Sequence, residues 1–235
     1  MRVLIGTSGF SYPKWRGSFY PEKMPEAKML GHYAERLPTV EINNTFYRMP
    51  APETFQRWAS ETPVGFRFAL KSPRRITHDK KLVDVAAAVD KLDQAAQALG
   101  DKLGPILFQL PPFLRMDLVR LDDFLAGLPK TLRPAVEFRH ESWFTPEVFA
   151  RLRFHGAALC VAESEDLATP FEATADFGYL RLRRQDYDDA ALAQWAERLT
   201  TQGWETAYVF FKHEDEGKGP ALAAQLAKMV PTMLP

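Results

Sequence analysis

Two hydrophobic periodicities alternate along the whole chain. Eight short runs rich in β-branched or aromatic residues recur, and most are separated by a stretch whose apolar residues lie three and four positions apart. This alternation predicts βα units, in which parallel strands are covered by helices. The expected strands are 3–6, 40–43, 66–71, 106–110, 135–139, 158–162, 179–183 and 208–212.

The segments between these runs carry the helix signals. The stripe of Val85, Val89 and Leu92 is typical of them, and prolines at 146 and 220 mark helix starts, where a missing N–H costs least. Segment 163–177 contains Pro170 and no such stripe, so we expect a loop or one short turn there. The pattern predicts an α/β fold, a (β/α)₈ TIM-type barrel forming a single domain over 1–235, with an irregular sixth βα unit.

Composition and charge exclude several classes of protein. Hydrophobic residues make up 46% of the 235 residues, enough for a sizeable core, and 30 basic residues balance 30 acidic ones, so no global field draws the chain to nucleic acid or membrane. The only cysteine, Cys160, lies in an apolar run and excludes disulfides and cysteine-based metal sites. Without a run of 18 apolar residues or a signal-peptide shape, we expect a cytoplasmic protein with no membrane contact.

Alternation along each strand predicts which side chains enter the barrel. The apolar set must face the helices, which leaves the polar set facing the lumen. The inward residues are expected to be Glu41, Asn43, Arg67, Lys71, Gln109, Glu137, Arg139, Tyr179, Arg181 and Arg183, with Lys212 assigned the same direction in the eighth strand.

Ionisable side chains inside a barrel need a reason, because burial of an unpaired ion costs several kcal/mol. One interpretation is a structural ion network that joins Glu41 and Glu137 to two arginines. The cations nevertheless outnumber these two glutamates, which predicts excess positive charge at the mouth, available to an anion. In this fold the site lies at the carboxyl ends of the strands, where Lys71, Arg139 and Arg183 are expected.

Three of the loops that follow strands carry candidate binding residues. The first, 6–15, mixes hydroxyl and aromatic side chains as a loop contacting a sugar or base does, although a glycine-rich turn with core aromatics gives the same pattern. The third, 71–78, is strongly basic, which is also typical of a solvated charge run. In the eighth, Gly217, Lys218 and Gly219 precede a helix and are candidate phosphate contacts.

A divalent metal is one alternative for the same face. His78, His140 and His213 follow the third, fifth and eighth strands, and a cluster with Glu41, Glu137 and Glu214 would suit a metal. Their spacing is not diagnostic, and hydrogen-bonded loop histidines are the competing interpretation. The identity of any cofactor therefore stays open.

Several motifs in order along the chain resemble the YecE-like family, domain of unknown function 72. They are IGTSGFSY at 5–12 with Trp15, FYP at 19–21, VEINNTFY at 40–47, FQLPP at 108–112, EFRH at 137–140 and SWF at 142–144. The resemblance covers nearly the whole chain and implies a TIM-type barrel without a settled activity. Where many relatives carry His-Gly and an Asn-rich strand end, this chain has Arg183-Arg184 and Lys212-His213, so ligand roles do not transfer to those two loops.

Three functions are compatible with these observations. The first is a barrel, enzyme or not, that binds a phosphate-bearing substrate such as a sugar phosphate or nucleic acid, as the barrels of apurinic-site endonucleases and sugar isomerases suggest by analogy. In it Arg139 is catalytic together with Glu41 or Glu137 as acid or base. The residues expected to bind substrate are Thr7, Ser8, Tyr12, Trp15, Asn43, Lys71, Gln109, His140, Trp143, Arg181, Arg183 and Lys212.

The second function is nucleic-acid binding without chemistry. Arg74, Arg75 and Lys80 would contact the backbone, and Trp15, Tyr47 or Trp143 would stack on bases. The third is a structural or interaction protein whose inward charges only stabilise the fold.

Overall fold

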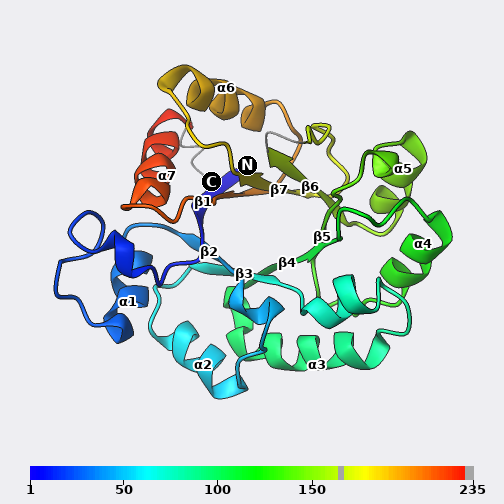
Figure 1. Cartoon of the computed structure of the whole chain (residues 1–235), viewed down its shortest axis with the longest axis horizontal. Coiled ribbons are helices and arrows are strands. Elements are labelled where there is room, and N and C mark those ends of the chain that lie inside the picture. The colour runs from blue at the N-terminus through cyan, green and yellow to red at the C-terminus, as the bar shows by residue number, and fades with distance from the viewer. Residues whose placement is uncertain (164–166, 231–235) are drawn as a thin grey trace.

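A computed structural model describes residues 1–163 and 167–230 of the chain. Eight parallel strands close into a barrel in the order of the sequence, and β1 completes the ring by pairing with β8 (Figure 1). The strands are β1 (Arg2–Ser8), β2 (Thr39–Ile42), β3 (Arg67–Lys71), β4 (Leu103–Gln109), β5 (Pro134–Glu137), β6 (Ala158–Glu163), β7 (Phe177–Leu182) and β8 (Thr206–Phe211). The predicted TIM-type barrel is confirmed.

Helices surround the barrel and cover its outer face (Figure 1). They are α1 (Met29–Ala34), α2 (Pro52–Ser60), α3 (Ala86–Ala96), α4 (Leu118–Ala126), α5 (Pro146–Phe154), α6 (Asp189–Thr200) and α7 (Lys218–Met229). Between β6 and β7 the described residues 167–176 form no helix, as the irregular sixth unit predicts. No helix in the described part of the chain is both long and apolar enough to cross a membrane.

Two buried layers follow from the alternation along the strands. The larger layer lies between the strands and the helices and includes Val40, Phe68 and Leu180. The smaller one fills the lumen and includes Leu4, Tyr179 and Phe210. Small lumenal side chains such as those of Ala69 and Ala135 leave room for the large ones, so the barrel is packed rather than hollow.

Five strands, β2, β4, β5, β7 and β8, end one or two residues earlier than the hydrophobic runs predict. Asn43, Arg183 and Lys212 directly follow the last residue of their strands and Arg139 lies two residues past the end of β5, so all four belong to the loops at the carboxyl ends. Their side chains therefore lie at the mouth of the barrel rather than within its wall, which is where this fold places ligand sites.

Candidate functional site

A buried ion network crosses the lumen just below the mouth. The Arg181 guanidinium lies between two carboxylates, with Nη2 2.9 Å from Oε1 of Glu41 and Nη1 2.6 Å from Oε2 of Glu137. All three side chains are buried, and the glutamates have no exposed surface. Because β2, β5 and β7 are not neighbours in the barrel, this triad ties together separate parts of the wall.

Hydrogen bonds saturate the remaining carboxylate oxygens. Ser8 Oγ donates to Oε1 of Glu41 at 2.7 Å, and Tyr179 donates its phenol to Oε2 at the same distance. Asn43 Nδ2 adds a longer bond of 3.2 Å to Glu41, and Gln109 Nε2 donates to Glu137 at 2.9 Å. Ser8, Asn43, Gln109 and Arg181 thus lie together in this network, where Ser8, Gln109 and Arg181 are buried, and their predicted contact with a substrate stays a prediction.

The two glutamates are fixed as carboxylates. Burial by itself would raise the pKa of Glu137, but the guanidinium groups of Arg181 and Arg183 outweigh it and bring that pKa down to about 2. Burial likewise opposes ionisation of Glu41, yet Arg181 and the hydroxyl donors lower its pKa too. A carboxylate held ionised far below neutral pH is a poor proton carrier. This argues against the predicted acid or base role of Glu41 and Glu137, which act instead as anchors for cations.

Lys71 lies at the end of β3 beside this network. Its Nζ donates to Oε1 of Gln109 at 2.9 Å and lies 4.1 Å from the centroid of the Phe46 ring. Burial, with Arg181 and Lys212 nearby, lowers the pKa of Lys71 to about 8 against the opposing pull of Glu137 and Glu41. The side chain is only partly buried.

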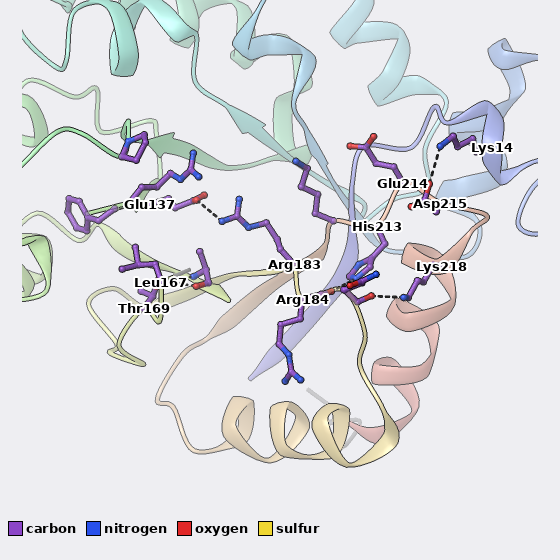
Figure 2. Close-up of a pocket in the computed structure, with 16 residues that line it drawn as sticks. Lys14, Glu137, Leu167, Thr169, Arg183, Arg184, His213, Glu214, Asp215 and Lys218 are labelled. Carbon is purple, nitrogen blue, oxygen red and sulfur yellow. Dashed lines mark hydrogen bonds and ion pairs between the residues drawn. The ribbon is translucent and has the colours of Figure 1, made fainter. Parts of the chain in front are cut away.

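A cavity of about 890 Å³ opens at the mouth between the loops after β5, β7 and β8. Figure 2 shows Arg183 reaching across it toward Glu137, with Lys14, Glu214 and Asp215 on the far side. Its charged or titratable lining residues are Lys14, Glu137, Arg139, Arg183, Arg184, Lys212, His213, Glu214, Asp215 and Lys218.

Some of the lining cations already have carboxylate partners. Lys14 lies 3.0 Å from Asp215, Arg184 lies 3.6 Å from Glu163, and Lys218 pairs with Asp186. Lys218 is therefore engaged, which disfavours its predicted phosphate contact. Its neighbour Gly219 is buried and is not one of the residues that line the cavity.

Other cations on the cavity are under-paired. Within the described residues, neither Arg139 nor Lys212 lies within ion-pair distance of a carboxylate, and both are exposed. Arg183 contacts Glu137 at 3.5 Å through one terminal nitrogen, while its buried Nε has no hydrogen-bond partner. The predicted excess of positive charge at the mouth therefore belongs to these three side chains.

Three residues predicted to touch a ligand are instead parts of the core. Thr7 is fully buried, and its hydroxyl bonds to Gly9 O at 2.7 Å and Tyr33 Oη at 2.9 Å. Trp15 and Trp143 are also fully buried, with their indole N–H groups donating to the backbone of Glu214 and Leu114. These two rings offer no face for stacking, because aromatic side chains beside a buried strand end fill the core.

Two further loop residues lie near the mouth with their polar atoms engaged. Tyr12 donates its hydroxyl to the Ser8 carbonyl at 2.7 Å, and burial, followed by the charge of Glu214, raises its pKa to about 12. His140 accepts the Ser142 N–H at 3.1 Å through Nδ1 and so caps a short helical turn.

Arg67 corrects the count of cations at the mouth. It faces inward as expected but stands at the first residue of β3, and its charge acts on Tyr208 together with Arg2 and Arg133 near the amino ends of the strands. Alternation along a strand predicts which way a side chain points but not its height in the barrel, so Arg67 does not add to the positive charge at the mouth.

The side chains proposed for a metal do not converge. Within the described residues, no group of three or more His, Cys, Asp or Glu is placed to hold a metal ion. His78 instead bonds to Thr77 Oγ1 at 2.9 Å, and His213 bonds to the Arg184 carbonyl at 2.6 Å. Both histidines make the local loop contacts that the competing interpretation expects.

Lys14 and Phe46 are site residues that the sequence reasoning missed. Lys14 meets Asp215 because β1 and β8 are neighbours, which brings the first and last loops together. This contact could have been predicted from the fold, because the first and last strands of a closed barrel must pair and so bring their loops together. Phe46 lies in the matched VEINNTFY segment, but nothing in the pattern shows that its ring faces Lys71.

Comparison with known proteins places the chain. A family model described as a protein of unknown function, DUF72, matches residues 4–234. The chain belongs to the DUF72 family. The UPF0759 protein YecE of Escherichia coli K12 is 32% identical over 143 residues, covering 60% of this chain and 50% of YecE. YunF of Bacillus subtilis is 27% identical over 155 residues, 63% of this chain and 54% of YunF. The chain thus spans about half the length of the curated relatives it matches.

Solved structures agree on the fold. A DUF72 family protein from Thermotoga maritima superposes with a TM-score of 0.87 at 27% identity, over 97% of this chain and 99% of that one. A DUF72 family protein from Enterococcus faecalis gives a TM-score of 0.80 at 19% identity, over 99% of this chain and 100% of that one. At that identity the second comparison supports the barrel alone.

Proposed function

We propose that this DUF72 barrel binds a phosphate-bearing small molecule, such as a sugar phosphate, in the cavity at its mouth. The observation that supports the proposal is the trio of under-paired cations on one cavity, Arg139, Arg183 and Lys212. Arg139 and Lys212 have no carboxylate partner within the described residues, and Arg183 has a single contact of 3.5 Å with Glu137. Cations paired this weakly repel one another, and a polyanion relieves that repulsion while using their vacant hydrogen-bond donors.

The architecture beneath the trio favours the same ligand class. Arg183 is held from below by Glu137, which is itself fixed by Arg181, so the guanidinium is positioned before any ligand arrives. Preorganised donors lose little freedom on binding, which improves affinity. A cavity of about 890 Å³ also falls within the size range of small-molecule sites, about 300–1,000 Å³.

Matched ligand pairs test this proposal. Thermal unfolding is measured with glucose 6-phosphate against glucose and with ribose 5-phosphate against ribose. We expect the melting temperature to rise only with the phosphorylated member, because ligand that binds the native state stabilises it. Equal shifts within each pair, or none with either phosphate, would contradict the proposal.

Single-stranded nucleic acid is a second candidate ligand, favoured by one surface feature. Tyr47 is 81% exposed and Phe113 is 66% exposed, in the loops after β2 and β4. Lys81, from the basic loop after β3, lies 5.4 Å from the Phe113 ring. Exposed aromatics beside basic side chains suit base stacking and backbone contact.

Salt dependence checks this second candidate. The affinity for an oligothymidylate is measured by fluorescence anisotropy over a range of salt concentrations, with Tyr47→Ala compared with the unchanged protein. A nucleic-acid site predicts a steep loss of affinity with salt and about a tenfold loss in the variant, from removal of one stacked base. Binding that ignores both salt and Tyr47 rules this candidate out.

A further inference from the structure

We infer that Lys71 is a nucleophilic amine that forms an imine with the carbonyl group of an anionic aldehyde or ketone at the mouth of the barrel. The inference rests on the proposed function. Lys71 ends β3 at the mouth, outside the lining of the cavity, and the charge of the lining residue Lys212 acts on it, so in this inference the under-paired cations hold the anionic group while Lys71 meets the carbonyl carbon. It names a substrate class for the site and a covalent role for one of its residues.

The surroundings of Lys71 Nζ differ from those of a structural lysine. Its polar partner is the neutral amide oxygen of Gln109 at 2.9 Å, and within the described residues no carboxylate lies within ion-pair distance. Gln109 is fixed in this orientation because its other end donates to Glu137 at 2.9 Å. The network therefore presents an uncharged acceptor to Lys71 and keeps the nearest carboxylate occupied elsewhere.

Charge and burial around the amine favour its neutral form. Loss of hydration disfavours the ammonium first, and the nearby Arg181 and Lys212 add repulsion. The carboxylates of Glu137 and Glu41 act in the opposite direction and favour the ammonium, as does the Phe46 face 4.1 Å away. The balance leaves the pKa of Lys71 at about 8, so a useful fraction of the side chain is a free amine near neutral pH.

His78 is placed to assist the proton transfers that imine formation needs. Its ring packs edge-on against Phe46 at 4.9 Å between centroids, the same ring that Lys71 contacts. Burial first, then the charges of Lys71 and Arg74, lower the pKa of His78. The charge of Lys71 acts on His78, so the two side chains belong to one cluster around Phe46, and a neutral imidazole there accepts a proton and returns it.

The step balances without any further reagent. The Lys71 nitrogen lone pair attacks the carbonyl carbon, and the π electrons move to oxygen, giving a carbinolamine after proton transfer. That intermediate loses its hydroxyl group as water while the C=N bond forms. Both amine hydrogens leave in the released water molecule, and nothing is oxidised or reduced.

Reductive trapping tests the inference on the whole chain. The protein is incubated with dihydroxyacetone phosphate or with dihydroxyacetone, sodium borohydride is added, and modified lysines are located by peptide mass spectrometry. We expect Lys71 to be the main modified lysine with the phosphorylated ketone, at about ten times its labelling by dihydroxyacetone, as one lost phosphate–cation contact implies. Labelling at Lys71 should rise with pH around a midpoint of about 8.

Variants and outcomes separate this inference from the proposed function. Lys71→Arg keeps a cation but removes the amine, so it should lose the adduct at this position while retaining the phosphate-dependent thermal shift. In the unchanged protein, modification spread over surface lysines such as Lys91 and Lys130 without preference for Lys71 would overturn the inference, even if that variant fails to fold. Retained thermal shifts alongside such spread labelling would overturn the imine alone, whereas loss of the shifts would overturn the proposed function as well.

Discussion

Arg181 organises the interior of this barrel. A buried guanidinium costs several kcal/mol in lost hydration, which is offset only when its charge meets well-placed carboxylates. Glu41 and Glu137 supply them at 2.9 and 2.6 Å. The arrangement also fixes the direction of Gln109 and Arg183, so the network in the lumen determines which donors face the mouth.

Removing one carboxylate from this network should be costly. Glu137→Gln keeps the volume of the side chain but leaves Arg181 and Arg183 short of one negative charge. We expect the free energy of unfolding to fall by about 3–5 kcal/mol, as for other broken buried ion pairs. Urea denaturation measures it, with Asp215→Asn as the matched control, because the Lys14–Asp215 pair is exposed and should leave stability unchanged. Equal stability of the two variants would contradict the account of the network.

Acid should destabilise the native chain through the same carboxylates. The pKa of Glu137 is about 2 in the folded chain against an ordinary 4.5, and that of Glu41 is shifted in the same direction. A depressed pKa contributes stability that is complete above the ordinary value and is lost as pH falls from about 4.5 toward 2. Urea midpoints measured across this range should fall steeply in the unchanged protein and less steeply in Glu137→Gln. Parallel curves would show that Glu137 is not the titrating group.

Alternation along the strands predicted these inward charges from sequence alone. It predicted direction because a strand has only two faces, and the apolar face must meet the helices. It could not predict pairing, since Glu41 meets Arg181 across 140 positions of sequence. Pairing depends on which strands face each other across the closed barrel, and this is why the two glutamates looked available for catalysis.

The close approach of β1 and β2 depends on one glycine. A Cβ on Gly6 would lie 2.0 Å from the Thr39 carbonyl oxygen and 3.0 Å from the Tyr33 hydroxyl. Tyr33 uses that hydroxyl to bond both the Thr7 N–H and Thr39 O at 2.9 Å, so it links α1 to the two strands. Neither the backbone nor this buried phenol can move away easily.

Gly6→Ala should therefore open the first strand pair. We expect the free energy of unfolding to fall by about 3 kcal/mol, at the upper end of overpacking costs. Gly31→Ala is the matched control. Gly31 lies inside α1, and a Cβ added there would have only Glu61 O nearby, at 3.9 Å. This substitution should raise the free energy of unfolding by about 0.5–1 kcal/mol, because alanine favours a helix over glycine. Chemical denaturation measures the free energy of unfolding of both variants. An unchanged free energy of unfolding in Gly6→Ala would refute the packing argument.

All eight strands appear near their predicted positions, as do the helices expected around Val89 and at the prolines 146 and 220, but the ends of several elements do not match. Helix α3 stops at Ala96, whereas its apolar stripe continues to Leu99 in a 3₁₀ segment that includes Gly100 at a φ of 55°. An apolar stripe in the sequence reports burial rather than helical structure, so a buried residue in the segment after a helix makes the helix look longer than it is. The same effect extended the fifth predicted strand, because Phe138 is buried although β5 ends at Glu137.

Closure of the barrel gives the mouth two unlike sides. Lys14 and Lys218, from the loop after β1 and the start of α7, are paired with carboxylates, whereas Arg139 and Lys212 have no carboxylate partner in the part of the chain that the structure describes. The sequence, with net charge +0, predicted an excess of cations here without showing which ones are neutralised. Which cations are neutralised depends on ion pairs between loops that are distant in sequence, such as Lys14 with Asp215, and the pattern along a single strand does not predict these pairs.

Calorimetric titration with inorganic pyrophosphate tests the anion site most directly. The unchanged protein is compared with Arg139→Ala/Lys212→Ala and with Lys91→Ala, which removes an exposed lysine of α3 remote from the cavity. We predict saturable binding at one site per chain, weakened by about a hundredfold in the double variant, or about 1.4 kcal/mol for each lost cation, and unchanged in Lys91→Ala. Equal affinity in all three proteins would contradict the assignment of the mouth as an anion site.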